Sequence, residues 1–186
     1  IIIVDASAGA KVGDEDTNTV KSSVRAAATL ASDILSDRNR VGLIVIGDML
    51  DWIFPGQGRE QFYKIMDSLS NIRSGGIWSL KDIRWILERF FPKKSLVLFI
   101  SPLTDPDVTE TLTEMSRKQY DLIVISPSPI DMEKKLSDIE DPLAEKINSL
   151  ERKGRLDALR NHGIVLDWDP DQPLELCLEE VRRFRM

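Results

Sequence analysis

Asp5 and Ser7 are the first residues of the chain that suit chemistry, because they directly follow the apolar run that opens it. Ser101 and Asp105 follow a later apolar run, and Ser79 stands at a predicted helix start. Parallel strands release their loops at one edge of a sheet, so these side chains are expected to converge there. Their oxygen atoms suit three roles: holding a hard cation, attack by the carboxylate, or contact with a partner. In a purely structural alternative, Asp5 only satisfies backbone N–H groups of the neighbouring loop.

Continuous apolar runs and helical periodicity predict the elements that position these residues. Runs without alternation are typical of strands covered on both faces, and they occupy residues 1–4, 41–47, 96–100, 122–125 and 163–168. Apolar residues at helical spacing predict helices over 20–35, 62–72, 80–90 and 174–184. The helix-start pairs Asp105-Pro106 and Asp141-Pro142 predict helices over 106–117 and 142–160. A short strand over 52–54 is expected to pair antiparallel with the strand before it. This alternation predicts an α/β three-layer sandwich with a six-stranded, mainly parallel sheet in the order 3-2-1-4-5-6.

The hairpin segment from Met49 to Phe54 permits two interpretations. Its apolar residues either fill the core at the sheet edge, which we expect, or expose an apolar contact surface.

Composition limits the class of protein. The 186 residues, 42% of them hydrophobic and 30% charged, fit one soluble globular domain over residues 1–186. A net charge of −6 argues against nucleic acid as a partner. No apolar run approaches the roughly 20 residues of a membrane helix, so this domain is not expected to span a membrane. Because the chain starts inside a strand without an initiator Met, we expect a longer parent protein.

Several familiar sites cannot be built from these residues. His162 is the only histidine, so a His-based triad or metal site is excluded within this chain. The segment after the first strand, Ser7-Ala8-Gly9, lacks the glycine spacing and the lysine of phosphate-binding loops. Cys177 is the only cysteine and is expected on the buried face of the last helix, as a core thiol.

With its elements placed, the chain resembles a von Willebrand factor A (VWA) domain. The resemblance rests on an apolar strand ending in Asp5-x-Ser7, a long Ala-rich helix, Arg40-Val41-Gly42-Leu43-Ile44 leading into a hairpin, and a strand ending at Ser101. The closing segment, Asn161 to Pro170 followed by Pro173-Leu174, is similar to that of an A-domain family that accompanies MoxR-type AAA ATPases in prokaryotes. The resemblance covers nearly the whole chain.

The resemblance also implies a metal-ion-dependent adhesion site, and this sequence departs from it. An intact A domain holds a hard cation with Asp-x-Ser-x-Ser, a Thr from a second loop and an Asp after the fourth strand. Gly9 stands at the third position, Pro102 stands where the acidic ligand is expected, and only Ser79 offers a hydroxyl in the second loop. Asp105 could reach the site but suits the cap of the next helix. We therefore expect a degenerate site with neither metal nor cofactor.

An apolar strand that ends in Asp also resembles the haloacid-dehalogenase-type phosphotransferases, which is the enzyme alternative. Asp5 would then be the nucleophile and Ser101 would hold phosphate. That chemistry needs a second carboxylate two residues after the first, and Ser7 occupies this position.

The leading prediction is a non-enzymatic protein–protein interaction module without catalytic residues. The family resemblance implies a MoxR-type AAA ATPase as partner and a parent protein that is membrane-associated through upstream segments. The partner is expected to contact the face formed by Asp5, Ser7, Ser79, Ser101 and Asp105.

Overall fold

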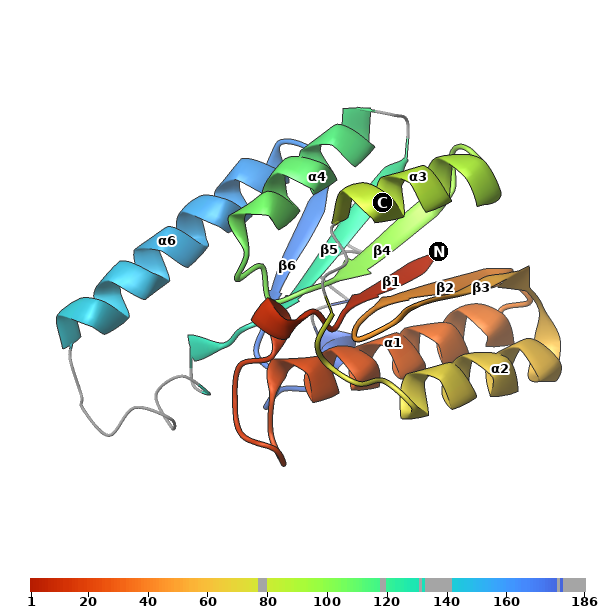
Figure 1. The fold of residues 1–186 in the computed structure, drawn as a ribbon, viewed down its shortest axis with the longest axis horizontal. Helices are drawn as coiled ribbons and strands as arrows, with labels where there is room; N and C mark the ends of the chain where they lie inside the picture. The colour runs from red at the N-terminus through yellow and green to blue at the C-terminus, as the bar shows by residue number, and fades with distance from the viewer. Residues whose placement is uncertain (77–79, 118–119, 131, 133–141, 177, 179–186) are drawn as a thin grey trace.

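The computed structural model describes residues 1–76, 80–117, 120–130, 132, 142–176 and 178, and its main element is one six-stranded sheet (Figure 1). The strands are β1 (Ile2–Asp5), β2 (Val41–Ile46), β3 (Leu50–Gly56), β4 (Leu96–Ile100), β5 (Asp121–Pro127) and β6 (Ile164–Trp168). The helices are η1 (Ala8–Ala10), α1 (Thr19–Ser36), α2 (Gly58–Ser70), α3 (Leu80–Phe90), α4 (Pro106–Arg117) and α6 (Pro142–Arg160).

The strand order is β3-β2-β1-β4-β5-β6, as predicted. All neighbouring strands pair in parallel except β2 and β3, which form the antiparallel edge pair. β1 lies in the middle, with Ile3 opposite Ile44 on one side and Phe99 on the other. The carboxyl ends of β1 and β4 are therefore neighbours, which places Asp5 beside the loop after β4.

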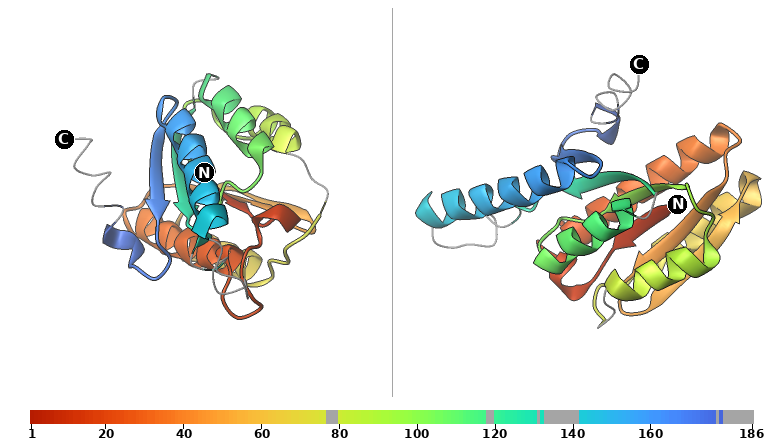
Figure 2. Two further views of the ribbon diagram at one scale, coloured as in Figure 1. Left: turned by 90° about the vertical axis from the view of Figure 1, so that its left-hand side faces the viewer. Right: turned by 90° about the horizontal axis from the view of Figure 1, so that it is seen from above.

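Helices cover both faces of the sheet (Figures 1 and 2). Ile2 and Val4 pack with α1 and α2 on one face, whereas Ile3 packs with α3, α4 and α6 on the other. Successive side chains of a strand point to opposite faces, so a strand buried on both faces must be apolar throughout. This requirement explains the continuous apolar runs in the sequence.

The hairpin at the sheet edge differs from the expectation. β3 extends over Leu50–Gly56, and only part of it fills the core. Ile53 packs against the α1–α2 face, whereas Met49, Trp52 and Phe54 are exposed. The core-filling interpretation was therefore wrong for these three side chains, because β3 lies at the sheet edge and few atoms cover its outer surface.

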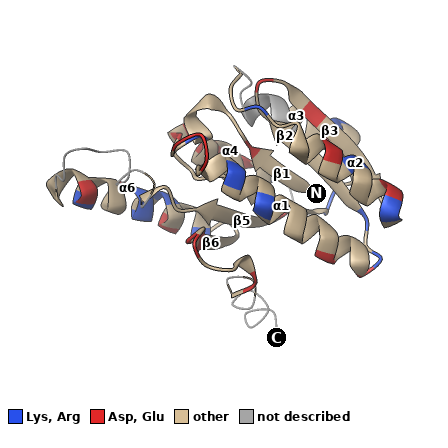
Figure 3. Ribbon diagram, turned by 90° about the horizontal axis from the view of Figure 1, so that it is seen from below, with Lys and Arg blue, Asp and Glu red and all other residues tan. Residues whose placement is uncertain are grey.

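Helix α6 extends beyond the sheet (Figure 2, right). Its residues 142–151 are exposed and carry both acidic and basic groups (Figure 3). Its second half packs against the protein through the buried side chains of Arg152, Leu156 and Leu159. The predicted helix over 174–184 falls mostly outside the described residues, as does Cys177.

Candidate functional site

Asp5 ends β1 with its carboxylate turned into the protein, and its residue is only 3% exposed. One oxygen, Oδ1, accepts hydrogen bonds from the Ser7 backbone N–H at 3.1 Å and from Ser7 Oγ at 2.7 Å. The other, Oδ2, accepts from Ser101 Oγ at 2.7 Å. The predicted convergence of Asp5 with Ser101 is confirmed, and both carboxylate oxygens are engaged within the protein.

The electrostatics of Asp5 are those of a carboxylate in the core. Burial raises the pKa of Asp5 above its ordinary value of 3.8, because the charged form loses hydration. The hydrogen bonds from Ser101 and Ser7 oppose this rise in pKa, and the nearby negative charge of Asp105 adds to it. The Asp5 and Asp105 side chains therefore interact electrostatically, although they come from different loops.

The loop after β4 is joined to the end of β1 by short contacts. Ser101 Oγ accepts from the backbone N–H of Leu103 at 3.1 Å, and Leu103 is buried with a left-handed φ of 57°. Thr104 Oγ1 donates to the carbonyl oxygen of Gly9 at 2.6 Å, which ties the two loops together. Asp105 Oδ1 accepts from the N–H of residue 107 at 2.9 Å, so Asp105 caps α4 as its type predicts.

A buried arginine that the sequence analysis did not single out holds the same loop from the other side. Arg152 Nη1 donates to the carbonyl oxygen of Pro102 at 2.8 Å. Its Nη2 donates to Ser126 O at 3.2 Å, to Ser126 Oγ at 3.0 Å and to Asp167 Oδ1 at 2.5 Å. Arg152 therefore joins the carboxyl ends of β4, β5 and β6. The available signal was periodicity, since position 152 lies on the same helix face as the apolar residues 156 and 159.

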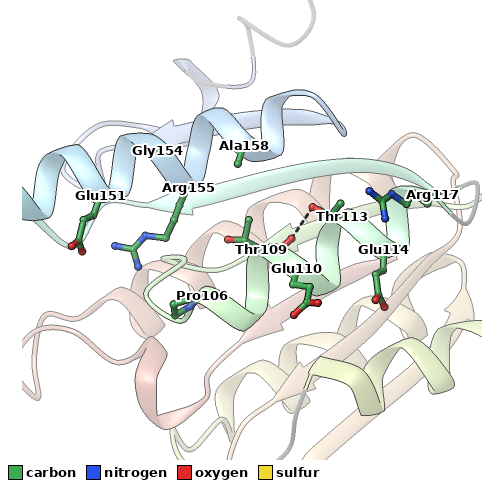
Figure 4. Close-up of a pocket in the computed structure, with 10 residues that line it drawn as sticks. All are labelled: Pro106, Thr109, Glu110, Thr113, Glu114, Arg117, Glu151, Gly154, Arg155 and Ala158. Atoms are coloured by element: carbon green, nitrogen blue, oxygen red, sulfur yellow. Dashed lines mark hydrogen bonds between the residues drawn. The ribbon is translucent and has the colours of Figure 1, made fainter.

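A hollow of about 810 Å³ adjoins this loop, between α4 and α6 (Figure 4). The hollow exists because small residues line it, among them Thr109, Thr113 and Gly154. Arg155 extends from α6 towards α4 and donates to the carbonyl oxygen of Thr104 at 2.8 Å. The hollow and the loop after β4 therefore share a supporting side chain.

The arrangement offers little to a metal ion. Gly9 contributes only its carbonyl, which Thr104 already contacts, and Pro102 offers its carbonyl to Arg152. Within the described parts of the chain, no three His, Cys, Asp or Glu residues come together as a group that could hold a metal ion. Both carboxylate oxygens of Asp5 accept hydrogen bonds from hydroxyl groups, so the oxygen atoms that could bind a metal ion are already engaged within the protein.

The residues around Asp5 do not supply the groups that the phosphotransferase alternative requires. Ser7 stands where a phosphotransferase of that type needs its second carboxylate, and it donates to Asp5 instead. The buried Asp5 carboxylate offers almost no surface to a substrate. Of the predicted site residues, Asp5, Ser7 and Ser101 are in direct contact and Asp105 lies in the adjoining loop, whereas Ser79 lies outside the described residues.

A family model described as "protein of unknown function DUF58" matches residues 1–161 of the chain. The chain belongs to the DUF58 family. It matches no curated protein in sequence.

Solved structures show that this DUF58 chain has a VWA-like fold. The SpRpn10 VWA domain aligns with a TM-score of 0.58 and 12% identity, over 96% of this chain and 92% of that one. An aerotolerance-related membrane protein from Bacteroides fragilis NCTC 9343 aligns with a TM-score of 0.58 and 14% identity, over 98% and 97% of the two chains. The predicted VWA-like fold class is thus confirmed. In the described part of this DUF58 chain, no helix is both long and apolar enough to cross a membrane.

Proposed function

We propose that this DUF58 domain is a non-enzymatic protein–protein interaction module of the VWA type. The observation that supports this function is the inward arrangement of Asp5, whose two oxygens accept hydrogen bonds from Ser7 and Ser101. In this arrangement the Asp5 carboxylate holds the loops after β1 and β4 together and is not itself exposed to a partner. The face then offers half-buried Ser7 and exposed Asp105 to a partner.

The partner face comprises the loops after β1 and β4. It includes Asp5 and Ser101 as internal supports and Ser7 and Asp105 at the surface, and the sequence adds Ser79 as an expected member. The links from Thr104 to Gly9 and from Arg155 to Thr104 hold these loops in place, so the face is preorganised for binding.

The family resemblance supports a finer proposal about the assembly. A MoxR-type AAA ATPase is the proposed partner, and the proposed adhesion site is degenerate, with Gly9 and Pro102 in place of ligands. The proposed parent protein is membrane-associated through segments outside this domain. A membrane protein among the structural neighbours is compatible with this localisation.

Ser7→Arg tests the partner face. Ser7 is half-buried, so arginine places a long cation on the face. The variant loses the hydrogen bond from Ser7 Oγ to Asp5, which should cost about 0.5–1.5 kcal/mol and leave the domain folded. We expect the full-length variant to lose its co-purifying partner in the native host. Ser36→Arg, which makes the same charge change at the exposed end of α1, should retain it. A partner that still co-purifies with folded Ser7→Arg would rule out this face.

The competing enzyme function has its own test. A generic phosphatase screen of the purified domain is expected to show no activity. Activity that is lost in Asp5→Asn would favour the haloacid-dehalogenase-like alternative.

A further inference from the structure

Four exposed aromatic side chains form a continuous surface at the edge of the sheet, which we call the aromatic patch. It consists of Trp52 (39% exposed), Phe54 (54%), Trp85 (62%) and Phe90 (38%). Phe90 lies at its centre, with ring centroids 6.3 Å from Trp52, 6.1 Å from Phe54 and 5.6 Å from Trp85. Contiguous exposed apolar surface of this kind is uncommon on isolated domains and marks a contact surface.

Two elements that are distant in sequence build the aromatic patch. Trp52 and Phe54 come from the outer strand β3, and Trp85 and Phe90 come from α3. Phe91 is buried beneath and contacts Phe54, with ring centroids 6.1 Å apart. The rings are therefore fixed on rigid elements, and ordering them on binding costs little conformational entropy.

Basic residues border the aromatic patch. Arg40 donates from Nη2 to the carbonyl oxygen of Pro55 at 2.8 Å, which places it at the end of β3. Arg89 directly precedes the pair Phe90 and Phe91 in the chain, and Lys93 and Lys94 follow it after Pro92; all three basic residues are exposed. The chain as a whole carries a net charge of −6, so this concentration of positive charge is local.

The polar atoms of the two tryptophans remain available. Within the described residues, neither the Trp52 nor the Trp85 indole N–H donates a hydrogen bond to the protein. An exposed indole with a free N–H beside basic side chains is the combination that favours the headgroup level of a lipid bilayer.

We propose that the aromatic patch with its basic border docks on the surface of an anionic phospholipid bilayer. The aromatic rings would enter the headgroup region, and the four basic residues would lie over the lipid phosphates. This surface shares no residue with the proposed partner face, so the two proposals stand or fall separately.

Other occupants fit less well. In a two-fold dimer, the aromatic patch of one copy would face the aromatic patch of the other. The two basic borders would then lie close together, which is unfavourable because their charges repel. A protein partner that anchors a side chain needs a pocket for it. In the described part of the chain, the hollow between α4 and α6 and the cavities of about 590 and 580 Å³ could serve, and none of the three is lined by a residue of the aromatic patch. A bilayer surface needs no such pocket.

Sedimentation of the purified chain with sucrose-loaded vesicles tests the proposal. We expect binding to phosphatidylcholine vesicles that contain about 30% phosphatidylglycerol and little binding to phosphatidylcholine alone. The double variant Lys93→Glu/Lys94→Glu should lower the partition coefficient about tenfold or more. Trp85→Ser should lower it about fivefold, because it removes an exposed ring with little effect on the core.

Two matched variants control for net charge and for loss of an aromatic ring. Lys146→Glu/Lys153→Glu makes the same charge change on exposed positions of α6, and Tyr63→Ser removes a ring that is 66% exposed on α2. Both should bind within about twofold of the wild type. Equal binding to both vesicle types, or equal losses in test and control variants, would overturn the proposal. Self-association in sedimentation velocity that Trp85→Ser abolishes would also overturn it, in favour of a second copy.

Discussion

Arg152→Ala removes the side chain that joins the carboxyl ends of three strands. The guanidinium donates to Pro102 O, Ser126 O, Ser126 Oγ and Asp167 Oδ1, and the residue is only 5% exposed. Alanine leaves three buried acceptors without their donor, while the Asp167 carboxylate is 44% exposed and can be solvated.

The magnitude follows from these buried contacts. Each buried acceptor left without its donor costs about 1–1.5 kcal/mol, so the three acceptors together cost roughly 3–5 kcal/mol. The Asp167 carboxylate adds little to this cost, because water can replace the guanidinium at its exposed side. We therefore expect Arg152→Ala to lower the free energy of unfolding by about 3–5 kcal/mol, which corresponds to a fall in Tm of roughly 6–20 °C for a chain of this size.

Urea unfolding followed by circular dichroism measures this loss, with two variants of the same helix as controls. Arg155→Ala removes one half-buried hydrogen bond, to Thr104 O, and should cost about 0.5–1.5 kcal/mol. Arg160→Ala removes an exposed ion pair with Asp157 and should cost less than about 0.5 kcal/mol. If Arg152→Ala costs no more than Arg155→Ala, Arg152 does not hold the strand ends together.

Four further predictions concern the site and the rest of the domain. Because burial raises the folded-state pKa of Asp5 above 3.8, its contribution to stability is largest at low pH and falls as pH rises through the folded-state pKa. The stability of the wild type relative to Asp5→Asn, measured by urea unfolding, should therefore decrease from about pH 4 to pH 7, and an increase would contradict a raised pKa. Mg²⁺, Mn²⁺ or Ca²⁺ should leave Tm unchanged; a saturable rise at sub-millimolar metal that Asp5→Ala abolishes would show a working metal site. Gly47→Ala would place Cβ 2.6 Å from the carbonyl oxygen of Arg73 and should cost about 1–3 kcal/mol. Gly154→Ala, which meets open space on α6, should stabilise by about 0.5–1 kcal/mol in the same unfolding assay.

The contact between Asp5 and Ser101 was predictable because it needs only the strand order and the rule that loops of parallel strands meet at one edge. The hydrogen bonds that Ser7 donates to Asp5 could not be predicted in the same way. Ser7 was expected to face a partner or a ligand, yet its hydroxyl and its N–H both turn to Asp5. A side chain two residues from a buried carboxylate can serve either role, and only the path of the loop decides between them.

The sequence by itself determined which segments form strands and helices, because burial on both faces demands continuous apolar runs and burial on one helix face demands helical spacing. Tertiary structure alone decided which polar groups those elements bring together. Arg152 stands 50 residues from Pro102 and 26 from Ser126. It reaches both because α6 packs on β6 and α4, which places Arg152 beside the carboxyl ends of β4 and β5. Likewise, apolar sequence cannot tell a covered ring from an exposed one: Trp52 and Phe54 stay at the surface because β3 lies at the sheet edge and α3 ends beside it.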